Sequence, residues 1–307
     1  MTDSIIFAGT PHNAADTLRA LVAAGVEVEF VLTRTDSPFG RKRVLTPSPV
    51  AIAATELGLP VIKANSIDSL VLTHLNSSRS QMAIVVAFGV LLKSEAINSL
   101  TKGWFNLHYS LLPALRGAAP VQHALLKGLR ETGVTVFKID EGLDTGPVVA
   151  TVPSSIEPTD NAGTLLRRLT ELGTSLLLQE IPRLLSGVGI LLKPQEGVIS
   201  LAPKLSRQDA KISFETKASL QSNLIRATNP EPGAWCLIEN ETLKVLEARE
   251  TESNRLAQGE VELIEGRVLC GFADGATLQL ITVQPAGKTA MNATDWLRGR
   301  QGKVWLT

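Results

Sequence analysis

The chain is poor in cysteine and aromatic residues, and it carries no excess charge. Its two cysteines, Cys236 and Cys270, lie far apart, and no histidines accompany them at metal-ligand spacing. This predicts neither a disulfide framework nor a zinc site, and buried reduced thiols are expected. Because 30 Lys and Arg balance 30 Asp and Glu, any contact with nucleic acid must depend on a local basic patch.

Long apolar segments are also missing. The start, MTDSIIFAGT, combines an acidic residue with an apolar run too short for a signal peptide, and no later run has membrane length. We therefore expect a cytoplasmic protein that needs no membrane. A chain of 307 residues with 44% hydrophobic residues is long enough for two domains.

Short β-branched runs alternate with stretches of helical spacing through the first two thirds of the chain. This alternation predicts βαβ units and an α/β fold with a mostly parallel sheet. The expected strands are residues 4–9, 26–34, 60–64, 82–88, 104–108, 132–139 and 148–156, and the expected helices are 14–24, 49–57 and 68–76. A long amphipathic helix opening at Asp160 should close this domain.

The remaining third has a different pattern. A segment rich in Gly and Pro has no sustained period and is typical of a linker across the surface. After one helical stretch, residues 218–228, short alternating runs predict a small barrel; these runs are residues 234–239, 242–248, 259–264, 267–272 and 277–282. We expect an N-terminal domain over residues 1–188, a linker over 189–206 and a C-terminal barrel domain over 207–307.

The turn after the first strand, FAGTPHNA, invites comparison with a dinucleotide-binding fingerprint. That fingerprint needs further glycines where this chain has Pro11 and residues with side chains. A tight turn at Gly9 that opens a helix is the preferred interpretation, and no nicotinamide site is expected.

Two later segments, NLHYSLLPALRGAAP and FKIDEGLDTGPVV, could carry chemistry. Asn106 and His108 are two residues apart on a strand, so their side chains share a face and could meet a developing oxyanion. Asp144 could fix the tautomer of His108 and favour its protonated form. Both His108 and Asp144 follow strand-like runs, and ligands of open α/β sheets bind beyond the carboxyl ends of strands. The trio suits acyl transfer without a covalent intermediate, because nothing marks a base for Ser110 as a nucleophile.

These residues also have a structural interpretation. A single His on a strand is more often a satisfied structural residue, and Asp-Thr-Gly is a common turn in which Asp caps the backbone. The basic run Arg41, Lys42 and Arg43, near Arg34, is by default a solvated face. Its alternative interpretation is a basic finger that meets a phosphate backbone.

The motifs together identify a family. FAGTP, DSPFGRKRVLTPSPV, VVAFG, NLHYSLLPALRGAAPVQ, ETGVTVFKIDEGLDTGP, LAPKLS and IRATNPEPGAW closely resemble the methionyl-tRNA formyltransferase family, in order and over essentially the whole chain. The Asn-x-His-x-Ser-Leu-Leu-Pro core with Leu-Asp-Thr-Gly marks enzymes that use 10-formyltetrahydrofolate. The basic loop, Arg-Gly-Ala-Ala-Pro and NPEPGAW point to the member specific for tRNA.

The resemblance implies a Rossmann-like formyltransferase domain followed by an OB-like β-barrel. The implied reaction transfers the formyl group of 10-formyltetrahydrofolate to the α-amino group of methionyl initiator tRNA, which gives N-formylmethionyl-tRNA for translation initiation. It requires no metal and no nicotinamide, and its partners are the folate cosubstrate and the tRNA, with no membrane and no DNA.

The resemblance also implies site residues. Asn106, His108 and Asp144 occupy the catalytic positions, and Arg41, Lys42 and Arg43 lie in the loop that enters the acceptor end of the tRNA. The implied folate-binding positions are Phe88, Gly89, Val90, Leu91, Ser110, Leu111, Leu112, Pro113, Asp140, Glu141, Gly142 and Leu143.

The chain departs from the family pattern at a few places. His12 and Asn13 stand where an acidic residue and Phe are common, and Ala114 and Leu115 stand where Arg and an aromatic are common. Two other functions stay open. One is a folate-dependent formyltransferase that acts on another amine, such as a nucleotide-sugar or glycinamide ribonucleotide. The other is a non-catalytic RNA-binding protein.

Overall fold

The structure is a computed structural model, and it describes residues 4–40, 42–251 and 256–307. Its contacts divide the chain into two compact units. The first runs to Gly117 and also contains Thr132–Ser155 and Leu166–Leu201; the second contains Ala118–Glu131, Ile156–Leu165 and Ala202–Thr307. Because the units interleave along the sequence, the domain limits drawn at residues 188 and 206 stay predictions.

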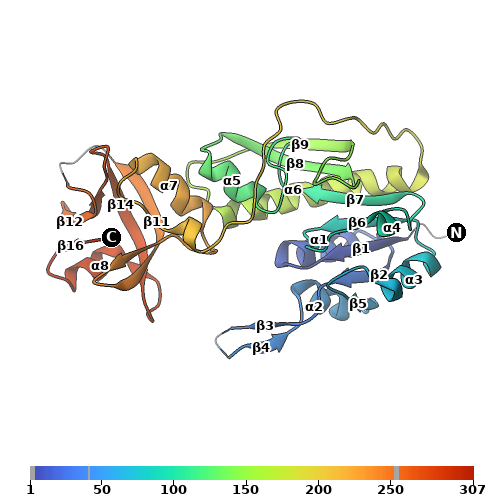
Figure 1. Cartoon of the computed structure of the whole chain (residues 1–307), viewed down its shortest axis with the longest axis horizontal. Coiled ribbons are helices and arrows are strands. Elements are labelled where there is room, and N and C mark those ends of the chain that lie inside the picture. Colours follow the sequence, from blue (N-terminus) through green and yellow to red (C-terminus); the bar gives the residue numbers. More distant parts are fainter. Residues whose placement is uncertain (1–3, 41, 252–255) are drawn as a thin grey trace. The chain divides into compact units, whose positions relative to one another are not determined.

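A seven-stranded sheet forms the centre of the first unit (Figure 1). Its strands, in spatial order, are β5 (Val61–Lys63), β2 (Val28–Thr33), β1 (Ile5–Gly9), β6 (Met82–Val86), β7 (Gly103–His108), β8 (Glu131–Lys138) and β9 (Val148–Ser155). The first five strands pair in parallel, and β8 pairs antiparallel with β7. The mostly parallel sheet is therefore confirmed. Every residue of β1 and β6 is buried, as expected for strands covered on both faces.

Helices cover both faces of this sheet. On one face lie α1 (His12–Ala23) and α6 (Ala162–Ser186), joined by the hydroxyls of Thr17 and Thr174 at 3.0 Å. A Cβ added at Gly173 of α6 would lie 2.7 Å from the Leu107 side chain of β7. Residues alternate along a strand, so Asn106 and His108 point to the opposite face.

That opposite face carries a hydrophobic cluster that includes Trp104 of β7. Against it pack α3 (Ser69–Ser77) and α4 (Ser94–Ile97), while α2 (Pro49–Glu56) lies beside α1. Ser48 caps α2 by accepting from the Ala51 N–H at 3.0 Å, and Pro follows it at the first helical position.

The basic segment forms a hairpin instead of an irregular loop. Its strands are β3 (Ser37–Phe39) and β4 (Val44–Thr46), which pair antiparallel. Arg41, one of the residues expected to bind tRNA, lies outside the described residues. At the base of the hairpin, Lys63 forms an ion pair with Asp36 at 2.6 Å.

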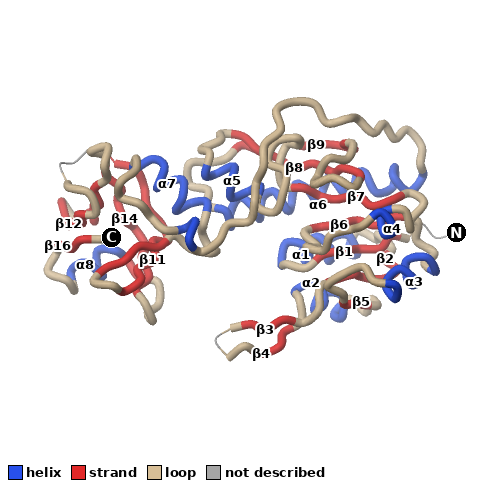
Figure 2. Tube along the Cα trace, viewed as in Figure 1, coloured by secondary structure: helices blue, strands red, loops and turns tan. Residues whose placement is uncertain are grey.

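The second unit is a nearly closed antiparallel barrel (Figure 2). The strands, in spatial order, are β10 (Trp235–Ile238), β11 (Glu241–Thr251), β14 (Thr277–Pro285), β13 (Arg267–Gly271), β12 (Glu260–Ile264) and β16 (Lys303–Trp305), with β15 (Met291–Asn292) beside β14. Leu237 and Thr307 exchange backbone hydrogen bonds of 2.7 and 2.9 Å, so the chain returns to β10 after β16. The predicted barrel is therefore confirmed.

Three α-helices contribute side chains to the hydrophobic core of the second unit or pack against it. They are α5 (Pro120–Leu126), α7 (Ala218–Ala227) and α8 (Ala293–Arg298), together with the short 3-10 helix η1 (Gln208–Ala210). Cys236 and Cys270 are both buried, unpaired thiols inside this core. Burial raises the pKa of the Cys236 thiol to about 12 and that of Cys270 well above its usual value. Among the helices that the structure describes, none is long and apolar enough to cross a bilayer.

Candidate active site

His108 lies at the end of β7, and only 4% of its surface is exposed. Its Nε2 is 2.9 Å from the carbonyl oxygen of Leu115. A carbonyl oxygen can only accept a hydrogen bond, so Nε2 carries the proton and donates. In the neutral ring, Nδ1 is then the unprotonated nitrogen and is able to take up a proton.

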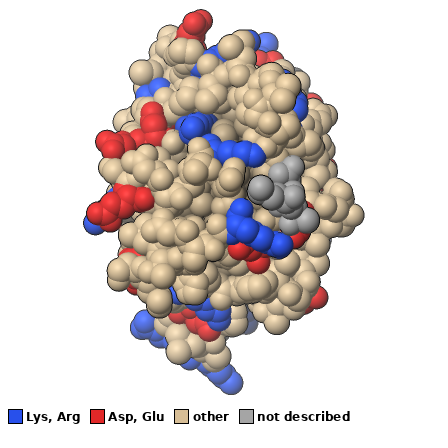
Figure 3. Space-filling view, turned by 90° about the vertical axis from the view of Figure 1, so that its right-hand side faces the viewer, with Lys and Arg blue, Asp and Glu red and all other residues tan. Residues whose placement is uncertain are grey.

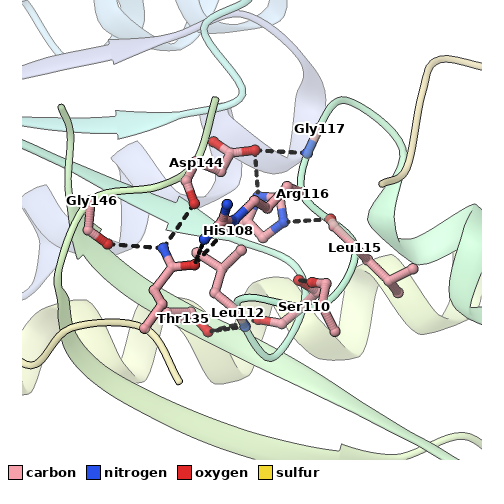
Figure 4. Close-up of polar contacts among 11 residues, drawn as sticks. His108, Ser110, Leu112, Leu115, Arg116, Gly117, Thr135, Asp144 and Gly146 are labelled. Atoms are coloured by element: carbon pink, nitrogen blue, oxygen red, sulfur yellow. Dashed lines mark hydrogen bonds and ion pairs between the residues drawn. The ribbon is translucent and has the colours of Figure 1, made fainter. Parts of the chain in front are cut away.

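Asp144 faces this second nitrogen (Figure 4). Its Oδ2 lies 3.7 Å from Nδ1 of His108 and accepts a hydrogen bond of 2.7 Å from the Gly117 N–H. The route by which Asp144 arrives differs from the expected one. Because β8 runs antiparallel to β7, its last residue, Lys138, pairs with Phe105, three residues before His108 along β7. The loop of residues 139–147 must therefore fold back to bring the carboxylate to His108.

Two opposing effects set the pKa of His108. Burial lowers it, and this effect exceeds the raising effects of the Asp144 carboxylate and the Leu115 carbonyl. The pKa consequently lies below its ordinary value, and the imidazole of the free protein is neutral at pH 7. Asp144 thus favours the protonated form of His108, as the sequence suggested, but in the free protein this effect is smaller than the cost of burying the charge.

Asn106 supplies a free amide on the same face of β7. It is partly exposed, and its side chain forms no hydrogen bond within the described ranges. It pairs across the sheet with Phe137, whose ring meets the His108 ring edge-on at 6.4 Å. An uncommitted amide N–H beside a buried imidazole can stabilise negative charge on an oxygen atom.

The loop after β7 is held by side chains from within the unit. Ser110 is buried, and its hydroxyl donates to the carbonyl of Ala114. Thr135 of β8 donates to the Ser110 carbonyl at 2.7 Å and accepts from the Leu112 N–H at 3.2 Å. The Leu112–Pro113 peptide bond is cis. Ser110 thus has a structural role in holding the loop, and Leu111 beside it is half-buried.

The other positions expected to bind folate lie in two neighbouring loops. The Thr10 hydroxyl donates to the Phe88 carbonyl at 2.7 Å, which holds the start of the loop Phe88, Gly89, Val90 and Leu91. Ser94, just after this loop, donates to a carboxylate oxygen of Glu141. The structure therefore links this loop with the turn Asp140, Glu141, Gly142 and Leu143.

Two leucines in these loops are left uncovered. Leu91 is 81% exposed and Leu143 is 61% exposed. The turn itself is internally bonded, because Asp140 accepts from the Gly142 N–H at 3.1 Å and from the Thr145 hydroxyl at 2.6 Å. An apolar side chain presented by an ordered turn can cover the flat face of a ring.

The family departures occupy defined places. Asn13 in α1 donates to the Tyr109 hydroxyl at 2.8 Å, next to exposed His12. Leu115 adopts a left-handed backbone with φ of 60° and presents its carbonyl to His108. Neighbouring Ala114 presents its carbonyl to Ser110. The backbone atoms of these last two residues are thus part of the site.

Gln195 is a site residue that the sequence did not indicate. It lies in the predicted linker, where no period or motif marks it. Its amide group donates to the backbone carbonyls of Asp144 and Gly146, each at 2.8 Å, while its oxygen accepts from Arg116. These partners come from separate segments, so only the folded chain brings them together.

The basic hairpin presents both charge and apolar surface. Lys42 and Arg43 are exposed, and neither forms an ion pair with the residues that the structure describes. Phe39 is 74% exposed and Leu45 is 67% exposed. On the face of the molecule in Figure 3, Lys and Arg are interspersed with Asp and Glu, with basic side chains at its lower end. Lys42 and Arg43 therefore give the hairpin exposed positive charge, unpaired within the described part of the chain.

Metal ligation has no candidate in the described ranges, where no group of three or more His, Cys, Asp or Glu side chains is placed to hold an ion.

Comparison with known proteins supplies the relatives of this chain. A family model described as formyl transferase matches residues 3–181, and one described as formyl transferase, C-terminal domain, matches residues 204–301. The methionyl-tRNA formyltransferase of Renibacterium salmoninarum is 46% identical over 96% of both chains. That of Leifsonia xyli subsp. xyli is 44% identical over 99% of both.

A solved structure shares the fold. It is the N-formyltransferase from Helicobacter canadensis in complex with folinic acid and dTDP-3-aminofucose, with a TM-score of 0.67 at 20% identity over 92% of this chain and 99% of that chain. At this identity the likeness concerns the fold alone. The two matched domains, in order, and the near full-length identity show that the chain belongs to the formyl transferase family, among the methionyl-tRNA formyltransferases, and is a formyl-transferring enzyme.

Proposed function

We propose that the protein transfers the formyl group of 10-formyltetrahydrofolate to the α-amino group of methionyl initiator tRNA. The observation that carries the chemistry is the buried His108 with Nδ1 free to accept a proton 3.7 Å from Asp144, beside the uncommitted amide of Asn106. The substrate follows from the relatives, which are named methionyl-tRNA formyltransferases over 96% of their length.

The reaction begins with a neutral amine. An α-amino group has a pKa of about 7.7 to 8, so part of it is unprotonated near neutral pH. Its nitrogen attacks the formyl carbon, and the formyl oxygen becomes an oxyanion. The Asn106 amide donates to that oxyanion, and Nδ1 of His108 takes the proton that the attacking amine loses, so the charge that the ring gains stabilises the oxyanion further.

Proton transfer completes the exchange. The protonated His108 gives that proton to the departing folate nitrogen when the bond between this nitrogen and the formyl carbon breaks, and the ring returns to its neutral form. Asp144 is placed to assist, since 16% of its side chain is exposed while its Oδ2 faces His108. No residue of the enzyme forms a bond to the formyl group, which agrees with a Ser110 hydroxyl that is already engaged.

The folate is assigned to the two linked loops and the Ser110 to Pro113 segment. Support comes from the exposed side chains of Leu91 and Leu143, and from the folinic acid in the complex of the Helicobacter canadensis N-formyltransferase. The reaction needs no metal and no nicotinamide. Because its product serves translation initiation, we place it in the cytoplasm, with the formyltransferase chemistry in residues 1–188 and the barrel after the linker.

The tRNA is assigned to the basic hairpin. Lys42 and Arg43 carry unpaired charge on an exposed tip, and Arg41 adds to the same run in the sequence. Phosphate contacts by such side chains supply affinity that depends on salt. Exposed Phe39 offers a face on which a nucleobase can stack.

A transfer assay with competing acceptors tests the proposal. The purified protein receives labelled 10-formyltetrahydrofolate and either charged initiator tRNA, a nucleotide-linked amino sugar or glycinamide ribonucleotide. We expect product with the charged tRNA, and Asn106→Ala and His108→Ala should each lower turnover about a hundredfold to a thousandfold. Transfer to the amino sugar or the ribonucleotide alone would replace the proposed acceptor, and folate binding without any transfer would favour a binding protein.

A further inference from the structure

We propose that Gln195 and Ser200, two residues of the segment Lys193–Leu201, are positioning residues that hold Asp144 and Leu115 against His108. We call this segment the strap. The sequence suggested only a surface linker here. The inference rests on the proposed function, because it assigns how the catalytic pair of that reaction is held.

Gln195 holds the loop that carries Asp144. Its Nε2 donates to the carbonyls of Asp144 and Gly146 at 2.8 Å each. Its Oε1 accepts two hydrogen bonds from Arg116, at 2.6 and 3.2 Å. One side chain therefore joins the loop of Asp144 to the segment after β7 (Figure 4 shows Asp144, Gly146 and Arg116 converging here).

Ser200 holds the other partner of His108. Its hydroxyl accepts from the Leu115 N–H at 2.9 Å, and its carbonyl accepts from the Arg116 N–H at 2.9 Å. The strap is anchored at both ends, because Lys193 exchanges backbone hydrogen bonds with Val148 and Leu201 pairs with Arg116. The strap is thus an ordered element across the site.

Backbone conformation explains why such support is needed. Asp144 and Leu115 have φ angles of 51° and 60°, in the left-handed region that side-chain-bearing residues seldom occupy. Conformations of this kind persist when surrounding contacts hold them. The strap supplies a contact to each: Gln195 binds the carbonyl of Asp144, and Ser200 binds the N–H of Leu115. The two residues whose oxygen atoms face the ring nitrogens of His108 therefore have strained backbones, and the strap holds both.

The charge environment of His108 gives the strap a measurable effect. Among the described residues, Asp144 is the charged group whose field raises the pKa of His108, against the lowering effect of burial. Gln195 binds both the Asp144 loop and the Arg116 guanidinium. Loss of the Gln195 side chain releases this loop, and the Asp144 carboxylate then raises the pKa of His108 less. The pKa of His108 should therefore fall.

The test uses the full-length protein and two substitutions at one position. Gln195→Ala removes every hydrogen bond of this side chain. Gln195→Glu keeps an acceptor for Arg116 but loses both N–H donors. We expect each to lower kcat roughly tenfold to a hundredfold, because a misplacement of about 1 Å at a reacting group has this scale of effect, with the KM for tRNA little changed. Glu196→Ala is the matched control, since Glu196 is exposed beside Gln195. Ser200→Ala should lose activity, and Ser200→Thr, which keeps the hydroxyl, should recover it.

A second readout needs no substrate. The chain has four histidines, so the His108 signal can be assigned in NMR spectra with a His108→Gln variant and followed through a pH titration. A folded Gln195→Ala protein should show a lower pKa for His108. If the pKa of His108 in this variant is unchanged or raised, or if its kcat is within about threefold of wild type, the proposed role of the strap is wrong. If the wild-type protein does not formylate charged initiator tRNA, the proposed function is wrong. The titration of His108 still tests whether the strap positions Asp144, because it needs no substrate.

Discussion

Removing the charge of Asp144 while keeping its shape tests the catalytic pair. In Asp144→Asn, the amide oxygen can still accept from the Gly117 N–H, which lies 2.7 Å from Oδ2. That oxygen takes the place of Oδ2, so it also lies opposite Nδ1 of His108, but it carries no negative charge. The substitution therefore removes the field that stabilises a protonated His108 during the reaction.

The magnitude follows from the separation of the two groups. At 3.7 Å and an effective dielectric constant of about 20, the attraction between carboxylate and imidazolium is about 4.5 kcal/mol. Each 1.4 kcal/mol changes a rate about tenfold, so complete loss corresponds to about three orders of magnitude. Solvent screens part of this attraction, since 16% of the Asp144 side chain is exposed. We expect formyl transfer to slow about a hundredfold to a thousandfold.

A single-turnover assay measures the step without product release. Enzyme in excess over charged initiator tRNA, with saturating 10-formyltetrahydrofolate at pH 7.5, gives the rate constant of transfer. Glu196→Gln removes an exposed charge nearby and should leave that rate unchanged. A folded Asp144→Asn protein with a rate within about threefold of wild type would refute the role of this charge.

Three further predictions concern stability, tRNA binding and the thiols. Burial holds the pKa of His108 below its unfolded value of 6.5, so the unfolded chain binds a proton that the folded chain does not. The free energy of unfolding therefore falls as the pH drops below about 6.5. His108→Gln should reduce this pH dependence in thermal melts between pH 7.5 and 5.5, and an equal slope in the variant and wild type would contradict the prediction. Lys42→Ala and Arg43→Ala should each raise the KM for tRNA, leave the KM for folate unchanged and reduce the salt slope of binding by about 1; equal slopes would remove these residues from the tRNA contact. Because burial raises the pKa of Cys236 to about 12 and that of Cys270 well above its usual value, a thiol reagent at pH 8 should label neither cysteine in the native protein and both after denaturation.

The sequence predicted the elements with strong patterns. β1 and β6 are continuous apolar runs, buried throughout, and such runs between helical stretches are typical of a parallel sheet. The barrel strands were marked by alternation and turn residues, as in β11 and β14. The strands that were not predicted, β3, β4, β15 and β16, have two or three residues each, which is too few to show a period.

The sequence pattern did not predict strand direction or contacts between residues far apart in the chain. The alternation of β8 is the same whether it runs parallel or antiparallel to β7, so the return path of Asp144 could not be predicted. Gln195 touches Arg116, Asp144 and Gly146 from a segment rich in Gly and Pro, where one amide carries no signal. The lowered pKa of His108 depends on burial by groups distant in the sequence.

The most direct measurement of the central claim is formyl transfer from 10-formyltetrahydrofolate to initiator methionyl-tRNA against elongator methionyl-tRNA. Both carry the same amino acid, so a difference in kcat/KM reports recognition of the tRNA, and uncharged initiator tRNA controls for the acceptor amine. We predict N-formylmethionyl-tRNA from the initiator at a rate that far exceeds that from the elongator. Absence of formylated initiator tRNA, with purified folded protein and active folate, would contradict the account.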